Sequence, residues 1–423
     1  MSSIAMDLEE RFVNTILGRL YFADLPDRYE SIPKAHQDTF QWVFKSGSQQ
    51  HELNEQDSFV DWLSATNTKN IFWVTGKPGS GKSTLMKFMF NDDRTWDSLR
   101  AWTQGLPLVK AGFFFWNSGT AMQMSRIGLL QTLLHASLSH DKSTLMQLFQ
   151  HRWQQFVGFG GGRQPFSWVE LLQAFGTMVR APQTPTTFFF MIDGLDEFDG
   201  DPKDLVKLII SIAKYPHVKL CIASRPWLVF ADAFEDRPSL RLEYLTSNDI
   251  RNYIGFFFAT NKHYVRLSKL EPVRSASLIS DVAEKSAGVF LWVYLVVQSL
   301  LDGLSNADRM SDLIARLETL PPGLEELYAK LLGSLDANYS KHAYQLFCLV
   351  IVRPRPLLLE LYFADNEDDS SAIADEIRNL SSDQISHCLE TMQQRLISRC
   401  KGFLEVEDWH SNPNVALSEG MLA

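Results

Sequence analysis

One stretch of the chain, IFWVTGKPGSGKSTLMKF at residues 71–88, restricts the fold more than any other. It contains the spacing G-x-x-x-x-G-K-[ST] between a short apolar run, typical of a buried strand, and a segment with helical character. Glycines let the backbone wrap around a polyphosphate with its N–H groups pointing inward, and the helix that follows presents its positive N-terminal end to the anion. The stretch therefore predicts a strand, a phosphate-binding loop and a helix in direct succession.

The loop residues define an expected nucleotide site. Lys82 is expected to reach the β and γ phosphates, and the Ser83 hydroxyl is expected to ligate Mg²⁺. A chance glycine-rich turn is the alternative, but the strand before the motif and the helix after it favour phosphate binding. We expect Mg²⁺ and ATP or ADP as cofactors, although these residues do not distinguish ATP from GTP. The other loop residues expected to bind the nucleotide are Gly76, Lys77, Pro78, Gly79, Ser80, Gly81 and Thr84.

A second apolar run ends in a cluster of carboxylates, in TFFFMIDGLDEFDGD at residues 187–201. In P-loop NTPases an Asp at the end of such a strand helps the loop Ser or Thr to hold the metal, so Asp193 is expected to serve Mg²⁺. Glu197, or Asp196 beside it, is expected to orient or deprotonate the attacking water. Mg²⁺ and Lys82 would offset the repulsion between this base and the phosphates. A calcium-binding loop is the alternative, and its spacing does not fit these residues.

The next apolar run, VKLCIA at residues 218–223, is followed directly by Ser224 and Arg225. Ligands bind at the carboxyl ends of the strands in parallel α/β sheets, so we expect Arg225 to sense the γ-phosphate. An arginine that only ties the strand to the following loop is the alternative. The neighbouring phosphate and carboxylate motifs favour the sensor.

Short apolar runs alternate with longer helical stretches in the first part of the chain, and several of the runs are almost continuously apolar. This pattern predicts an α/β P-loop NTPase fold with a doubly wound, mostly parallel sheet, followed by all-α helical regions. A winged-helix-like character of the last region is implied by resemblance to a known family and not by this pattern. The expected strands are 71–75, 111–116, 187–192, 218–223 and 240–244. The expected domains are an N-terminal helical segment at 1–45, the NTPase domain at 46–230, a helical arm at 231–335 and a C-terminal helical region, resembling a truncated winged helix, at 336–423.

The composition excludes several classes of protein. A net charge of −10 without a dense basic run argues against a nucleic-acid partner. Four cysteines without a C-x-x-C pair fit neither a zinc site nor a disulfide framework, which favours a reducing compartment. The N-terminus lacks the pattern of a signal peptide, and the longest apolar run, 289–297, is too short to span a bilayer. We therefore expect a cytoplasmic protein with no membrane span.

Five motifs together resemble the NACHT-type NTPases of filamentous fungi, in the class of signal-transduction ATPases with numerous domains (STAND), with a nephrocystin-like N-terminal NTPase module. The resemblance implies an NLR-like switch that is ADP-bound at rest and ATP-bound and self-associated when activated, with an unknown protein effector. It also implies slow NTP hydrolysis and a role in fungal non-self recognition and heterokaryon incompatibility. The motifs are GKPGSGKSTLMKF, FFFWNSGT, FFFMIDGLDEFDGD, CIASRPW and GVFLWVYLVVQSLL, and the similar region runs from about residue 31 to residue 397.

Some features depart from this family pattern and keep other functions open. Phe290 stands where many relatives have the proline of a Gly-x-Pro motif in the helical arm. The N-terminal residues show no effector domain, and the tail lacks the expected His-containing segment and repeat-type sensor. The alternatives are therefore a nucleotide-binding scaffold that does not hydrolyse, or a truncated inactive remnant. A P-loop kinase is a third alternative, but it predicts an Arg-rich lid that the sequence does not contain.

Overall fold

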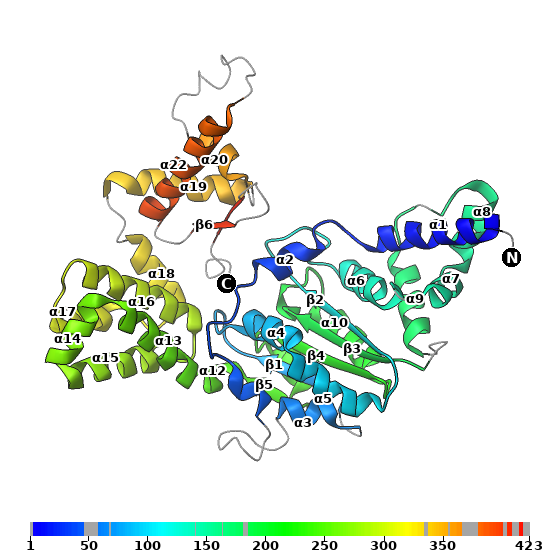
Figure 1. Ribbon diagram of the computed structural model, residues 1–423, viewed down its shortest axis with the longest axis horizontal. Coiled ribbons are helices and arrows are strands. Elements are labelled where there is room, and N and C mark those ends of the chain that lie inside the picture. Colours follow the sequence, from blue (N-terminus) through cyan, green and yellow to red (C-terminus); the bar gives the residue numbers. More distant parts are fainter. Residues whose placement is uncertain are drawn as a thin grey trace. The chain divides into compact units, whose positions relative to one another are not determined.

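The computed structural model describes residues 3–45, 58–66, 69–139, 141–162, 164–180, 185–333, 337–353, 356–365, 380–400, 404–407 and 414–417 (Figure 1). The chain forms two compact units, residues 1–253 and 254–423. The predicted domain boundaries at residues 46 and 336 fall on residues outside these ranges. The boundary predicted after residue 230 stays a prediction.

The first unit contains a five-stranded sheet in the order β2-β3-β4-β1-β5. Every pair of neighbouring strands in it is parallel, so the expected α/β fold with a parallel sheet is confirmed. Three of the strands, β1, β3 and β4, are buried along their whole length, as expected for strands covered on both faces. The strands are β1 (Ile71–Thr75), β2 (Leu108–Phe114), β3 (Thr187–Asp193), β4 (Val218–Ser224) and β5 (Ser239–Arg241).

Two strands differ from their predicted ranges by more than one residue, whereas β3 and β4 each end one residue later than predicted. The second strand begins at Leu108 and ends at Phe114, whereas 111–116 was predicted. The fifth strand is only three residues long, and Leu242–Leu245 form helix α12 instead of continuing it. The reason is pairing: β5 is an edge strand that pairs only with β1, which turns into the phosphate loop after Thr75. Among the described residues, β1 offers no pairing partner beyond Arg241.

Helices cover both faces of the sheet (Figure 1). The strand side chains alternate between the two faces. In β3, Phe188, Phe190 and Ile192 belong to one apolar core and Phe189 and Met191 to the other. The first core is completed by helices α1 (Ser3–Leu20), α6 (Arg126–Leu138), α7 (Lys142–Leu148), α9 (Trp168–Arg180), α10 (Pro202–Ile212) and α11 (Leu228–Phe234). The second is completed by the 3₁₀ helix η1 (Gln41–Phe44) and by α3 (Phe59–Ser64), α4 (Lys82–Asn91) and α5 (Asp93–Thr103).

The N-terminal segment packs into the first unit. Side chains of α1 lie in the core that includes α6 and α9. The short helix α2 (Leu25–Ser31) follows α1. The next element, η1, is held by Asp249 in helix α13 (Ser247–Thr260). The Asp249 carboxylate accepts hydrogen bonds from the Phe40 backbone N–H at 3.0 Å and from the Trp42 indole at 2.8 Å. Residues remote in sequence therefore hold this segment in place.

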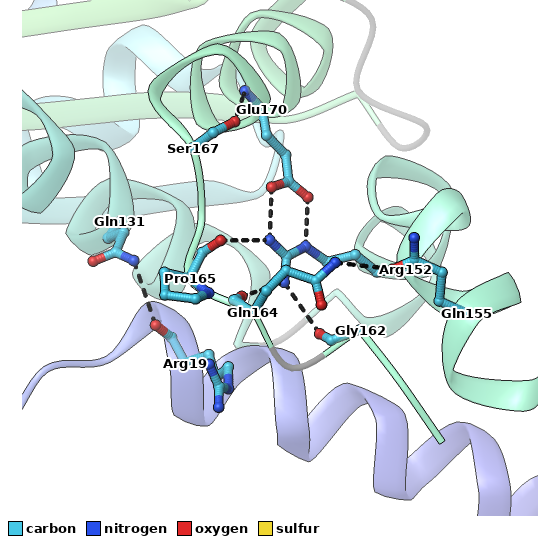
Figure 2. Close-up of polar contacts among 9 residues, drawn as sticks. All are labelled: Arg19, Gln131, Arg152, Gln155, Gly162, Gln164, Pro165, Ser167 and Glu170. Atoms are coloured by element: carbon cyan, nitrogen blue, oxygen red, sulfur yellow. Dashed lines mark hydrogen bonds and ion pairs between the residues drawn. The ribbon is translucent and has the colours of Figure 1, made fainter. Parts of the chain in front are cut away.

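A buried arginine organises the connection between α8 (Gln150–Phe159) and α9 (Figure 2). The Arg152 guanidinium donates to both carboxylate oxygens of Glu170, at 2.5 and 2.7 Å. It also donates to the backbone carbonyls of Gly162, Gln164 and Pro165, at 2.7–3.1 Å. These five contacts match the five N–H donors of an arginine side chain.

The second unit is mainly helical. In its last part Asp365 accepts hydrogen bonds from the His342 ring and from the Arg395 guanidinium. Among the described residues, none of the helices combines the length and apolar character needed to cross a bilayer. The elements after α13 are α14 (Lys262–Leu270), α15 (Pro272–Lys285), α16 (Phe290–Ser305), α17 (Met310–Thr319), α18 (Leu324–Gly333), α19 (Ala337–Val352), α20 (Leu358–Ala364), α22 (Ser382–Cys400) and the antiparallel pair β6 (Leu404–Glu407) and β7 (Asn414–Leu417).

Candidate functional site

The phosphate loop connects β1 to α4, as the sequence predicts. Gly79 and Gly81 have φ angles of +68° and +93°, a conformation that glycine adopts without steric cost. A Cβ atom at Gly76 would lie 2.7 Å from Ser80 Oγ and 3.0 Å from Glu243 Oε2. The loop therefore needs a glycine at each of these positions, and the three together shape a backbone cradle of the kind that binds phosphate.

Lys82 begins α4 and its ammonium lies against the loop. Its Nζ donates to the backbone carbonyls of Gly76 at 2.8 Å and Lys77 at 3.0 Å. Burial lowers the pKa of Lys82, while the nearby carboxylates of Asp196 and Asp193 act in the opposite direction. Lys82 therefore interacts electrostatically with the acidic residues at and after the end of β3, while its ammonium is hydrogen-bonded to the phosphate loop.

Ser83 and Asp193 form the expected metal corner. Asp193 ends β3 and is 2% exposed. Burial raises the pKa of Asp193 to about 6, against the hydrogen bond from Ser83 and the charges of Arg28 and Lys82, which lower it. A hydroxyl beside a carboxylate is a suitable oxygen donor pair for Mg²⁺, so the residues present fit the ion.

Glu197 lies four residues beyond Asp193, in the 3₁₀ helix η4 (Leu195–Glu197). Gly194, at φ +72°, makes the turn that brings it back to the edge of the sheet. Its Oε2 accepts a hydrogen bond from the backbone N–H of Asn117 at 3.0 Å. Burial raises the pKa of Glu197 to about 7, and the charge of Arg28 opposes this rise. A carboxylate with a pKa near neutrality is suited to accept a proton.

Asp196 and Arg225 contact each other. Asp196 Oδ2 lies 2.9 Å from Arg225 Nε, and Oδ1 accepts from the Arg225 backbone N–H at 2.8 Å. The two candidate carboxylates therefore have different partners: Asp196 holds Arg225, and Glu197 is oriented by the Asn117 backbone.

One residue at this site was missed by the sequence analysis. Arg28, in α2, is buried, and its Nη2 lies 3.4 Å from Ser83 Oγ. Its guanidinium also lies 5.6 Å from the centroid of the Trp116 ring. The stretch around it, DLPDRYESIP, contains no phosphate or metal motif, so only the tertiary structure identifies this arginine.

A strand, a glycine cradle and a Lys-Ser pair on one helix, beside a second strand that ends in a buried aspartate, define the P-loop NTPase class. Comparison with known proteins gives similarities that are more specific than this class. Residues 47–225 match the model of the nephrocystin 3 N-terminal family, and residues 334–420 match a domain of unknown function, DUF7791. The predicted resemblance is confirmed as a similarity: residues 47–225 are similar to the nephrocystin-type N-terminal NTPase module, and the chain is similar to a vegetative incompatibility protein.

The relative behind that statement is the vegetative incompatibility protein HET-E-1 of Podospora anserina. It is 27% identical to this chain over 324 residues, which cover 71% of this chain. The match covers only 22% of the length of HET-E-1.

Solved structures that the comparison matches to this chain include a Walker-type ATPase of Pyrococcus abyssi, at 14% identity and a TM-score of 0.33, covering 93% of this chain and 98% of that one. They also include Drosophila ORC bound to DNA, at 13% identity and a TM-score of 0.36, covering 84% of this chain and 88% of that one. The ORC1 protein of Aeropyrum pernix in complex with DNA, at 12% identity and a TM-score of 0.33, covers 89% and 92%. Likenesses at these TM-scores carry no argument about function.

Proposed function

We propose that this chain is a nucleotide-dependent signalling switch of the NACHT/STAND type, which binds ATP with Mg²⁺ and hydrolyses it slowly. The nucleotide state would control self-association and the approach of a protein effector, in fungal non-self recognition. The observation that carries the proposal is the convergence of Lys82, Ser83, Asp193 and Glu197 at one edge of the parallel sheet. GTP remains an alternative nucleotide, because the phosphate-binding residues do not read the base.

Each residue of the site has a chemical task in this proposal. The loop backbone and Lys82 bind the phosphates, and Ser83 and Asp193 hold Mg²⁺, which neutralises phosphate charge when bound. Glu197 accepts the proton of the attacking water, with its carboxylate oriented by the Asn117 N–H. Arg225, held by Asp196, senses the terminal phosphate.

A cytoplasmic location suits this function. The four cysteines, Cys221, Cys348, Cys388 and Cys400, are all unpaired in the structure, which fits a reducing compartment.

Nucleotide binding of purified protein tests the proposal directly. We expect Lys82→Ala to weaken the affinity for ATP roughly 10- to 100-fold, because it removes charge-assisted hydrogen bonds to phosphate. Lys207→Ala is the matched control, since its side chain is 75% exposed and lies on α10. Wild-type affinity in Lys82→Ala would show that the nucleotide does not bind at this loop.

Two further measurements separate the switch from its alternatives. Light scattering should show a larger particle with a non-hydrolysable ATP analogue than with ADP. Phosphate release should be slow but measurable. Binding without any phosphate release would instead favour the non-hydrolysing scaffold, and a chain that binds no nucleotide would favour the inactive remnant.

A further inference from the structure

Arg28 reaches the nucleotide site from a part of the chain that the nephrocystin-type match, residues 47–225, does not include. It lies on α2, only 5% exposed, although arginine is rarely buried without a charged or polar environment. Its Nη2 is 3.4 Å from the hydroxyl oxygen of Ser83, the residue expected to ligate Mg²⁺. The N-terminal segment therefore places a permanent positive charge beside the metal corner.

The same guanidinium acts on the Asp193 carboxylate of this corner and on the Glu197 carboxylate. Its charge lowers the pKa of Asp193 and is the largest effect opposing burial at Glu197. Two other basic groups of the site are engaged elsewhere: Lys82 donates to carbonyls of the loop, and Arg225 pairs with Asp196. Arg28 thus contacts the hydroxyl expected to ligate the metal, and its charge acts on the proposed base.

This position corresponds to the terminal phosphate. The metal held by the loop serine bridges the β and γ phosphates in P-loop NTPases, and the base lies next to the water that attacks the γ-phosphate. A cation that contacts Ser83 and whose charge acts on Glu197 is therefore expected to face the γ-phosphate rather than the α-phosphate. The planar guanidinium fork suits two phosphate oxygens at once.

A comparison with Arg152, another buried arginine of this chain, distinguishes a phosphate-binding role of Arg28 from a structural role. Arg152 is also buried, but its partners are Glu170 and three backbone carbonyls of the adjacent loop, which is the environment of an arginine that holds a loop together (Figure 2). The neighbours of Arg28 include Ser83, Asp193 and Glu197, which are residues of the nucleotide site, as well as the Trp116 ring.

We propose that Arg28 is a phosphate-binding residue that contacts the terminal phosphate of a bound nucleoside triphosphate, so that α2 distinguishes the triphosphate from the diphosphate. The inference rests on the proposed nucleotide-binding function. It adds that the discrimination depends on a helix outside the family module.

Affinities for Mg²⁺ with β,γ-imido-ATP and for Mg²⁺ with ADP, measured by calorimetry, test this inference without hydrolysis. Arg28→Gln should weaken binding of the triphosphate analogue about tenfold or more and binding of ADP less than about threefold. Lys34→Gln is the matched control, because it removes a positive charge from an exposed position of the same segment. It should leave both affinities unchanged. Arg28→Lys keeps the charge but not the fork and should give an intermediate loss.

The outcomes distinguish the two proposals. Equal weakening of both nucleotides, or no change in either, overturns the role of Arg28 while leaving nucleotide binding intact. If the wild type binds neither nucleotide, both proposals fail. Thermal unfolding without nucleotide checks that the variants fold, and if Arg28→Gln does not fold, the affinity ratio of Arg28→Lys decides: a ratio equal to that of the wild type contradicts the proposal.

Discussion

Asp196 holds Arg225 at two points, its guanidinium and its backbone N–H. The Oδ2–Nε distance is 2.9 Å and the Oδ1–N distance is 2.8 Å, and the Asp196 side chain is only 4% exposed. The contact joins the turn after β3 to the end of β4, so the acidic cluster and the arginine form one structure. It also separates the roles of the neighbouring carboxylates, because Glu197 contacts the Asn117 backbone instead.

Asp196→Asn should slow phosphate release about tenfold and leave nucleotide affinity largely intact. The amide can still accept from the Arg225 backbone but loses the charge-assisted bond to its guanidinium, and bonds of that kind contribute about 1.5–3 kcal/mol. A double-mutant cycle with Arg225→Gln tests whether the effect of Asp196 on phosphate release passes through Arg225. If Asp196 acts through Arg225, the double variant should be no slower than Arg225→Gln alone, and fully additive losses would contradict this.

Phosphate release should depend on pH through Glu197. Burial raises the pKa of Glu197 to about 7 in the free protein, and a base works only when deprotonated, so kcat/KM should fall as pH drops below about 7. Asp193, with a pKa of about 6, should steepen the fall below that value, because its protonated form binds metal poorly. Glu197→Gln should bind ATP normally and lose about 10²–10⁴-fold in turnover. A flat profile from pH 6 to 8 would show that another group is the base.

Lys219→Met should reduce the pH dependence of stability. Lys219 is fully buried on β4, donates to the Trp62 carbonyl and lies 4.7 and 5.3 Å from the ring centroids of Trp62 and Trp102. Burial lowers its pKa to about 7, whereas in the unfolded chain it is about 10.4. Between these values only the unfolded chain binds the proton, so the contribution of Lys219 to stability rises with pH, by up to about 1.4 kcal/mol per pH unit.

Urea unfolding at pH 6.5, 8 and 9 measures this effect. The wild type should gain more stability with rising pH than Lys219→Met does, and exposed Lys207→Met should follow the wild type. Parallel curves for the wild type and Lys219→Met would mean that Lys219 stays charged beside Trp62 and Trp102.

Arg152→Gln should destabilise the first unit by about 3–5 kcal/mol. The change leaves Glu170 and three carbonyls without their shared donor, and breaking a buried pair costs about that much. Arg100→Gln, which removes an exposed partner of Asp97, should change stability by less than about 0.5 kcal/mol. Denaturant unfolding followed by tryptophan fluorescence compares them, and similar losses in both variants would contradict the structural role of Arg152.

Most of the candidate site could be predicted because its parts are local in sequence. The phosphate loop requires glycines, Lys82 and Ser83 at fixed spacings within one strand–loop–helix unit, and the structure places them there. Asp193 could be predicted in the same way, because a continuous apolar run that ends in a carboxylate indicates the carboxyl end of a buried strand. The end of β5 was not predictable, because it depends on where the neighbouring β1 stops pairing.

By itself the sequence determined the fold class, the nucleotide loop and the strand that carries the acidic cluster, since hydrophobic runs and glycine spacings act over a few residues. Only the tertiary structure decided which groups meet. Arg28 lies beside Ser83 across 55 residues of sequence, and Asp196 selects Arg225 across 29. Such contacts depend on how helices and strands that are far apart in the sequence pack together. Because Arg28 lies in a short helix without a sequence motif, its neighbouring residues do not indicate which partner it contacts.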